Sequence, residues 1–228
     1  MYKVMTNMPF LQGVNGIDLA RIEDRTRIDY VHYTSNNGTI IRQGAPCQNL
    51  MFLASGQLSR TYQHPDELFT YTEKINSTHI VEPESLFGER PQYKASYATD
   101  LECDLLLMPK GDVIQTMMSN DTFRMNYFNA LTENVNKREQ QLMEWWPKNT
   151  IGKICQFLRN ITLIPEGEKI LAIKMKDLAA IIDETRLNVS KALNTMEENG
   201  MLSLHRKEIY ISDIALLGSE HNTTEKKC

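Results

Sequence analysis

The first half of the chain alternates between β-forming runs and turn residues at short intervals, and this pattern limits which folds the chain can adopt. From about Asp29 to Met108, apolar runs such as Leu50–Ala54, Leu68–Thr72 and Cys103–Met108 are separated by turns every eight to twelve residues. The turns contain Gly or Asn, which tolerate positive φ, and Pro, which fixes φ. The pattern indicates a β-sandwich or a β-roll.

A long helix is predicted to follow, over residues 120–146. The segment contains no Gly, begins with Asp121 and Thr122, and ends before Pro147. Its apolar residues recur at intervals of three and four and form a stripe: Tyr127, Phe128, Leu131, Val135 and Leu142. A stripe of this length packs either on the chain's own sheet or on the same helix of a second copy, and we favour the homodimer.

The sequence after residue 147 predicts a small domain that contains both helices and strands. We expect a helix over 148–161, a strand over 170–173, helices over 176–182 and 186–198, and a hairpin from 202–204 and 209–211. Residues 218–228 are polar and are expected to be a disordered tail. The predicted organisation is therefore a β-rich domain over 1–118, a long helix over 119–147, a C-terminal domain over 148–217, and the tail over 218–228.

Residues 175–202 have the pattern of a helix-turn-helix. Leu178 and Ile181 of the first helix can face Val189 and Leu193 of the second. Asp183 stands at the turn, where a left-handed residue is needed. Thr185 can cap the second helix, and Asn199-Gly200 can end it. Polar side chains then project from the end of the second helix that would enter a major groove.

The net charge says little about the chain's binding partners, whereas the positions of the charged side chains are informative. The chain has a formal net charge of −4, and residues 174–208 hold six positive and six negative side chains. The positive ones gather at the helix starts and the hairpin tip, where a winged helix contacts phosphates. Because short amphipathic helix pairs are common, a ligand-binding module whose C-terminal helices dock a protein partner is the alternative to a DNA-binding protein.

Several segments together resemble the CRP/FNR family of bacterial transcription regulators, over about residues 20–212. Ile41-Arg-Gln-Gly-Ala-Pro and Asn49-Leu-Met-Phe-Leu-Ala-Ser-Gly-Gln-Leu are similar to the family's paired glycine turns, at Gly44 and Gly56. Leu86-Phe-Gly-Glu and Thr185-Arg-Leu-Asn-Val-Ser-Lys resemble its sensor cassette and recognition helix. The resemblance implies an α+β fold: an N-terminal β-roll (a double-stranded β-helix, cyclic-nucleotide-binding-like) joined by a long dimerisation helix to a winged helix-turn-helix.

The resemblance also implies DNA contacts. Arg186 would recognise guanine through two hydrogen bonds, and Lys191 stands at the family's second base-contacting position. Leu187 replaces the usual Glu and can only meet a thymine methyl or pack, so the operator should differ from the family's commonest half-site. The other residues expected at the interface are Asn188, Thr185, Lys174, Lys176, His205 and Lys207.

The implied effector site is altered. Gly88 and Glu89 match the family's Gly-Glu pair, but Lys94, before Ser96, replaces the phosphate-binding Arg, for which Arg90 could substitute. Arg138 and Glu139 stand where cyclic-AMP-binding members have hydroxyls. Cyclic AMP is therefore not the expected effector; another small molecule and effector-independent action are the alternatives. In the second case Arg138 and Glu139 would form salt bridges across the dimer.

Other functional classes lack support in the sequence. The cysteines, at 47, 103, 155 and 228, form no metal-binding pair, so we expect neither a metal nor an iron–sulfur cluster. Cys103 and Cys155 should be buried, and Cys47, in a turn, should be the most reactive. The sequence shows no nucleophile–base group, no paired catalytic carboxylates and no P-loop, so we do not expect an enzyme. Without a long apolar run or a leader we expect a cytoplasmic homodimer whose partners are operator DNA and, for activation, RNA polymerase, with no membrane contact.

Overall fold

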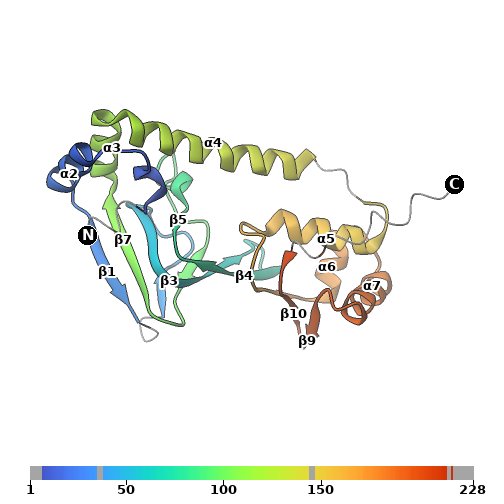
Figure 1. The fold of residues 1–228 in the computed structure, drawn as a ribbon. Helices are drawn as coiled ribbons and strands as arrows, with labels where there is room; N and C mark the ends of the chain where they lie inside the picture. The colour runs from blue at the N-terminus through green and yellow to red at the C-terminus, as the bar shows by residue number, and fades with distance from the viewer. Residues whose placement is uncertain (1–6, 35–37, 144–146, 215–216, 218–228) are drawn as a thin grey trace. The chain divides into compact units, whose positions relative to one another are not determined.

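The chain divides into two compact units in the computed structural model (Figure 1), which describes residues 7–34, 38–143, 147–214 and 217. The first unit comprises residues 1–60 and 75–137, and the second comprises residues 61–74 and 138–228. A hairpin from the first half of the sequence thus belongs with the C-terminal half. Among the described residues no helix is long and apolar enough to cross a membrane.

The first unit is built around antiparallel strands. β7 (Cys103–Pro109) pairs with β1 (Asp29–Tyr33) on one side and with β3 (Asn49–Gln63) on the other. β5 (His79–Val81) pairs with β3, and β2 (Thr39–Ile41) pairs with β6 (Ser96–Ala98), which also reaches β3. In β7, buried residues largely alternate with less buried ones, as expected for a strand with one face towards the core. The β-roll architecture is confirmed.

One of the two glycine turns depends on the absence of a side chain. The register between β3 and β7 shifts between Leu53 and Ser55, which marks a β-bulge. Gly56 follows with φ of 82°, and a Cβ atom built there would lie 2.3 Å from the carbonyl oxygen of Glu102. Only glycine therefore allows β3 to pass so close to β7 at this point.

Helices complete the first unit. Those that precede the strands or lie between them are η1 (Pro9–Leu11), α2 (Gly16–Arg25) and η3 (Pro83–Ser85), and α3 (Lys110–Ser119) and α4 (Asp121–Met143) follow β7. α4 confirms the long helix predicted over 120–146, of which 144–146 lie outside the described residues. α2 and α3 were not predicted from the sequence. For α2 a signal was present, because Asn15 caps it by accepting a hydrogen bond from the backbone N–H of Asp18.

The second unit contains the predicted C-terminal elements. They are α5 (Thr150–Ile161), β8 (Lys169–Ile173), α6 (Met175–Ile181), α7 (Arg186–Glu198), β9 (Ser203–His205) and β10 (Glu208–Ile211). Each bound lies within about two residues of the prediction, and α7 matches at both ends. The predicted tail, 218–228, lies outside the described residues.

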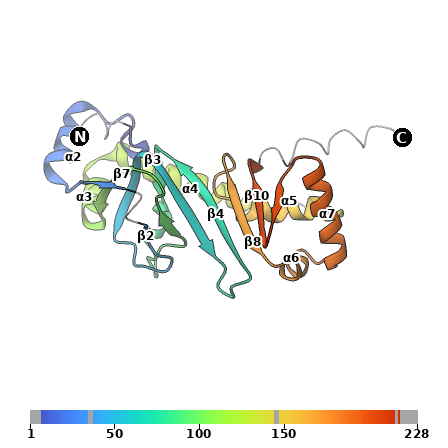
Figure 2. The same ribbon diagram turned by 90° about the horizontal axis from the view of Figure 1, so that it is seen from below.

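The sheet of the second unit is extended by β4 (Phe69–Asn76). β4 pairs with β8 in antiparallel register from Phe69↔Ile173 to Glu73↔Lys169, and β8 continues to β10 and β9 (Figure 2). Phe69 and Tyr71 lie in the same buried core as Phe157, whose ring meets that of Phe69 edge-on at 5.5 Å. The winged helix-turn-helix is thus completed by a strand from residues 61–74.

Candidate nucleic-acid interface and sensor site

The turn between α6 and α7 has the geometry that the sequence predicted. Asp183 adopts the left-handed conformation, with φ of 51°, and the hydroxyl of Thr185 accepts a hydrogen bond from the backbone N–H of Asn188 at 3.2 Å. Leu178 and Val189 are completely buried between the two helices. Ile181 is only half-buried, and its neighbour Ile182 fills the core in its place, because Ile182 lies in the turn that closes over the helix pair.

The start of α7 presents a mixed set of side chains to solvent. Arg186, Asn188 and Lys191 are exposed, as the prediction of base contacts requires. Leu187 is 63% exposed, which is unusual for a large apolar side chain on the first turn of a helix. The Leu187 side chain is therefore accessible to a ligand with an apolar group.

The wing is a short hairpin tied to the rest of the unit. β9 and β10 pair from His205↔Glu208 to Ser203↔Tyr210, and Lys207 at the tip has φ of 70°. The Lys207 carbonyl accepts a hydrogen bond from the backbone N–H of Ile173 at 3.2 Å. The ring of His205 packs edge-on against Tyr210, with centroids 4.5 Å apart. The basic tip is therefore held in place.

Three of the predicted phosphate contacts come together around one pocket. A largely apolar pocket of about 320 Å³ lies between the start of α6 and the wing, and Lys174, His205 and Lys207 contribute to its lining. Lys176, the second residue of α6, is exposed nearby. Residues separated by about thirty positions are thus gathered into one basic patch, which neither the start of α6 nor the wing provides alone.

A second hollow lies where α5 begins beside α7. Its lining consists of Asn149, Thr150, Ile151, Asn188, Lys191, Ala192 and Thr195. The Asn149 side chain accepts a hydrogen bond from the backbone N–H of Gly152 at 2.6 Å and caps α5. Asn149 and Thr150 were not among the predicted site residues, although an Asn-Thr pair before an apolar-faced helix is a recognisable start signal.

α4 has one buried and one exposed apolar face. Tyr127 is completely buried within its own unit, and its hydroxyl donates to the carbonyl of Pro83 at 2.7 Å. Phe128 and Val135, seven residues apart, are 47% and 61% exposed, and Leu131 is half-buried. Tyr127 therefore serves the intramolecular face and leaves the predicted dimer seam to the others. The predicted seam residue Leu142 lies outside the residues whose side chains the structure describes.

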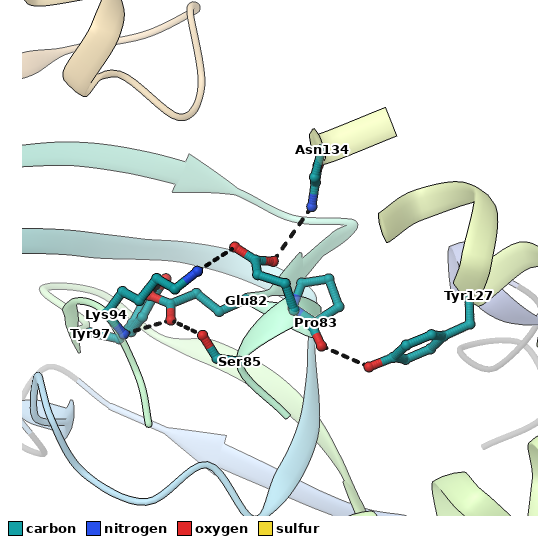
Figure 3. Close-up of polar contacts among 8 residues, drawn as sticks. Glu82, Pro83, Ser85, Lys94, Tyr97, Tyr127 and Asn134 are labelled. Atoms are coloured by element: carbon teal, nitrogen blue, oxygen red, sulfur yellow. Dashed lines mark hydrogen bonds and ion pairs between the residues drawn. The ribbon is translucent and has the colours of Figure 1, made fainter. Parts of the chain in front are cut away.

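A buried carboxylate occupies the centre of the sensor's polar network (Figure 3). Glu82, 4% exposed and with φ of 38°, precedes η3. Its carboxylate accepts hydrogen bonds from the Ser85 hydroxyl at 2.8 Å, the Lys94 backbone N–H at 2.7 Å and the Tyr97 hydroxyl at 2.9 Å. Burial beside this carboxylate raises the pKa of Tyr97 well above its ordinary value. Three donors that an anionic ligand could use are thus satisfied within the chain.

The predicted effector residues differ in their exposure and in their partners. Gly88, with φ of 102°, Glu89 and Arg90 are exposed. The ammonium of Lys94 lies 3.8 Å from the Glu84 carboxylate, which also accepts from Asn134 (Figure 3). The Ser96 hydroxyl accepts a hydrogen bond from the backbone N–H of Gln43 at 2.9 Å. Arg138 and Glu139 are exposed on the part of α4 that belongs to the second unit.

The cysteine expectations are confirmed in part. Cys103 and Cys155 are buried as predicted. Cys47 is also buried, at 3% exposure, and burial raises the pKa of its thiol. The turn that contains Cys47 packs against Tyr93 instead of facing solvent, so the thiol is as buried as those of Cys103 and Cys155, and its greater reactivity stays a prediction. No group of three or more metal-binding side chains occurs in the described part of the chain.

Comparison with protein families and known proteins agrees with this architecture. Residues 31–120 match the model of the cyclic nucleotide-binding domain, and residues 152–219 match that of the Crp-like helix-turn-helix domain. A global nitrogen regulator from Nostoc sp. is 26% identical over 185 residues, which cover 77% of this chain and 82% of the relative.

Solved structures share the fold. A chain from Eubacterium rectale assigned to the CRP/FNR family of transcriptional regulators aligns with a TM-score of 0.53 and 20% identity, over 93% of this chain and 97% of that one. The sensor domain of the transcriptional regulator DNR from Pseudomonas aeruginosa aligns with a TM-score of 0.50 and 15% identity, over 62% of this chain and 93% of that domain. With both family domains present in this order, the chain belongs to the CRP/FNR family of DNA-binding transcription regulators.

Proposed function

We propose that the protein is a homodimer that binds a two-fold-related operator through one α7 per subunit. The observation that supports this most directly is the exposed set on the first turns of α7, between two hollows lined by further polar residues. A dimer places its two recognition helices in successive major grooves, so the half-sites lie about one helical turn apart.

The base contacts follow from side-chain chemistry. The Arg186 guanidinium donates two parallel hydrogen bonds to O6 and N7 of guanine. Leu187, exposed and without polar atoms, contacts a thymine methyl. Lys191, one turn further along the same exposed side, provides a second contact to a base acceptor. These assignments predict a half-site that contains both guanine and thymine.

The phosphate contacts surround the base contacts. Lys174, His205 and Lys207 around the first pocket, with Lys176 nearby, grip the backbone on the wing side. Thr185, at the cap of α7, and the start of α5 at Asn149 and Thr150 approach phosphates on the other side, where helix N-termini favour an anion. These residues fix the register of α7 but carry no sequence information.

The dimer seam is proposed to run along the exposed face of α4. Phe128, Leu131 and Val135 supply the apolar contacts, followed by Arg138 and Leu142 at the next positions of the repeat. Arg138 and Glu139 form salt bridges across the seam. The sensor state sets the relative orientation of the two DNA-binding units through this helix pair.

The residues of the sensor cassette do not fit a cyclic nucleotide. A lysine that is already paired with Glu84 replaces the bidentate arginine, and the buried Glu82 carboxylate takes donors that a phosphate would need. We therefore propose that cyclic AMP is not the signal and that the dimer binds DNA without it. If Gly88, Glu89, Arg90, Lys94 and Ser96 bind an effector, its identity is open.

We further propose that the protein acts in the cytoplasm, where operator DNA and RNA polymerase are available, without a membrane contact and without a catalytic activity. Comparing the binding of two variants to an operator selected with the wild-type protein tests the DNA-binding role. Arg186→Ala should lose discrimination at one guanine by about 1–3 kcal/mol, whereas Lys207→Ala should weaken binding to all sequences alike and lower the salt dependence. If Arg186→Ala keeps its full preference while folded and dimeric, α7 does not contact the bases and docking to a protein partner becomes the better account.

A further inference from the structure

Asn188, an exposed polar residue of α7, is held by Glu184, to which the proposed DNA-binding function assigns no role. The Asn188 side-chain nitrogen donates to Oε2 of Glu184 at 3.1 Å. The other carboxylate oxygen of Glu184, Oε1, accepts from the ammonium of Lys153 on α5 at 2.9 Å. A chain of contacts thus runs from α5 through the turn before α7 to a side chain on the α7 surface.

This chain of contacts is partly shielded and anchored to the backbone. The side chains of Lys153 and Glu184 are only 19% and 14% exposed. The Lys153 ammonium also donates to the carbonyl of Asp183 at 3.2 Å, the residue with left-handed backbone in the turn. Hydrogen bonding from Lys153 and then from Asn188 lowers the pKa of Glu184, so its carboxylate is ionised at neutral pH. The position of the carboxylate is therefore fixed from two sides.

An ionised carboxylate can only accept hydrogen bonds, and this determines which way the Asn188 amide faces. Its nitrogen must point towards Glu184, so its oxygen, Oδ1, points away from it. One N–H hydrogen is used by Glu184, while the second N–H and Oδ1 stay available. This pair of groups is complementary to N7 and the N6 amino group of adenine.

We infer that Glu184 is a positioning residue that orients Asn188 to recognise adenine in the operator half-site. The inference rests on the proposed function, because it requires α7 to lie in the major groove. Lys153 supports it by neutralising Glu184, since an uncompensated carboxylate beside the DNA would repel phosphates. Specificity at this base pair thus depends on a residue that itself contacts no base.

The test is competition binding of the full-length protein to its selected operator and to duplexes with single base-pair substitutions. Asn188→Ala should lose roughly ten-fold preference at one A·T pair. Glu184→Ala should lose the same preference at the same pair, and the double variant should lose no more than either single one. The guanine preference that depends on Arg186 should stay unchanged in all three and serves as the internal reference.

Two further variants separate positioning from charge and from folding. Glu198→Ala removes an acidic residue from the far end of the same helix, so it should strengthen binding to all sequences alike without altering preference. Glu184→Gln has a similar size but offers one oxygen to two donors; Lys153 should take it, and the A·T preference should again fall. This variant keeps the test valid if Glu184→Ala fails to fold.

The outcomes distinguish the inference from the function on which it rests. If the wild-type protein shows no sequence preference, the proposed function fails. If the wild type shows an Arg186-dependent preference and both Glu184 variants retain the full base profile, only the positioning role is overturned. Loss of preference at one A·T pair, shared by the Glu184 and Asn188 variants, supports it.

Discussion

The hydroxyl of Tyr71 lies 2.6 Å from the hydroxyl of Thr162, 91 residues later in the chain, and both side chains are buried. Thr162 donates its own proton to the carbonyl of Leu158, so Tyr71 is the donor in this pair. Beside it, the buried Glu73 carboxylate accepts from the backbone N–H groups of Leu163 and Ile164. The strand β4 is thus fastened to the DNA-binding unit by buried polar contacts as well as by sheet pairing.

A fragment of residues 148–217 should consequently be much less stable than the same region in the full chain. It lacks Phe69 and Tyr71, whose removal exposes Phe157 and Leu171 and leaves β8 with an unpaired edge. We expect no cooperative urea transition for the fragment when followed by circular dichroism. A fragment that unfolds cooperatively at the midpoint found for this region in the full chain would show that β4 is dispensable.

The two glycine turns of the sensor should respond differently to the same substitution. Both Gly44 and Gly56 have positive φ, but only Gly56 faces backbone at 2.3 Å, and Gly44 faces open space. Gly44→Ala should cost about 1–2 kcal/mol of unfolding free energy, the ordinary cost of the left-handed conformation. Gly56→Ala should cost at least about 2 kcal/mol more, because β3 or β7 must move. Equal losses in denaturant titrations would contradict the close approach.

The difference between these glycines also shows what the sequence could and could not predict. Periodicity located β3, β7, α4 and α7, since side-chain alternation and helical spacing are local properties. The approach of Gly56 to Glu102, and the pairing of β4 with β8, join segments distant in sequence, and no local pattern encodes them. For the same reason, the turn before α7 was predicted correctly from local sequence, whereas the contribution of Lys153, which lies on another helix, was not.

The sensor unit should lose stability on mild acidification through His79. Burial, and then the positive charge of Arg60, lowers the pKa of His79 below its ordinary 6.5. The unfolded chain therefore binds a proton at this residue before the folded chain does, so the folded state is penalised as the pH falls below 6.5. The stability of the wild type should decline relative to His79→Gln between pH 7 and about 5. A difference that stays constant over this range would be inconsistent with a lowered pKa of the His79 imidazole.

The dimer should depend on the exposed face of α4. Val135→Glu places a charge in the proposed seam without disturbing the unit's own core, because Val135 is 61% exposed. We expect sedimentation to show monomers and the operator affinity to fall about ten-fold or more, since one subunit then binds without its partner. Asn136→Glu, at the next exposed position, adds the same charge beside the seam and should leave the dimer intact. Monomers in both variants would indicate a general charge effect, and dimers in both would place the seam elsewhere.

For the candidate site, as for the fold, local features could be predicted from the sequence and long-range contacts could not. Arg186, Asn188 and Lys191 could be named from sequence because they follow a cap on one helix. The seam prediction included Tyr127, since a helical stripe does not show which of its members pack inward; the Pro83 carbonyl and the rings of Phe10 and Phe87 decide this. Likewise, nothing in the sequence near Lys94 indicated that Glu82 would occupy the donors around it.

Selection of bound duplexes from a random DNA library, with purified full-length protein, no added ligand and about physiological salt, tests the central claim most directly. The account predicts recovery of a two-fold-symmetric motif whose half-sites contain guanine and adenine or thymine and lie about one helical turn apart. Binding that is independent of sequence and disappears with salt, both alone and with cyclic AMP present, would contradict it.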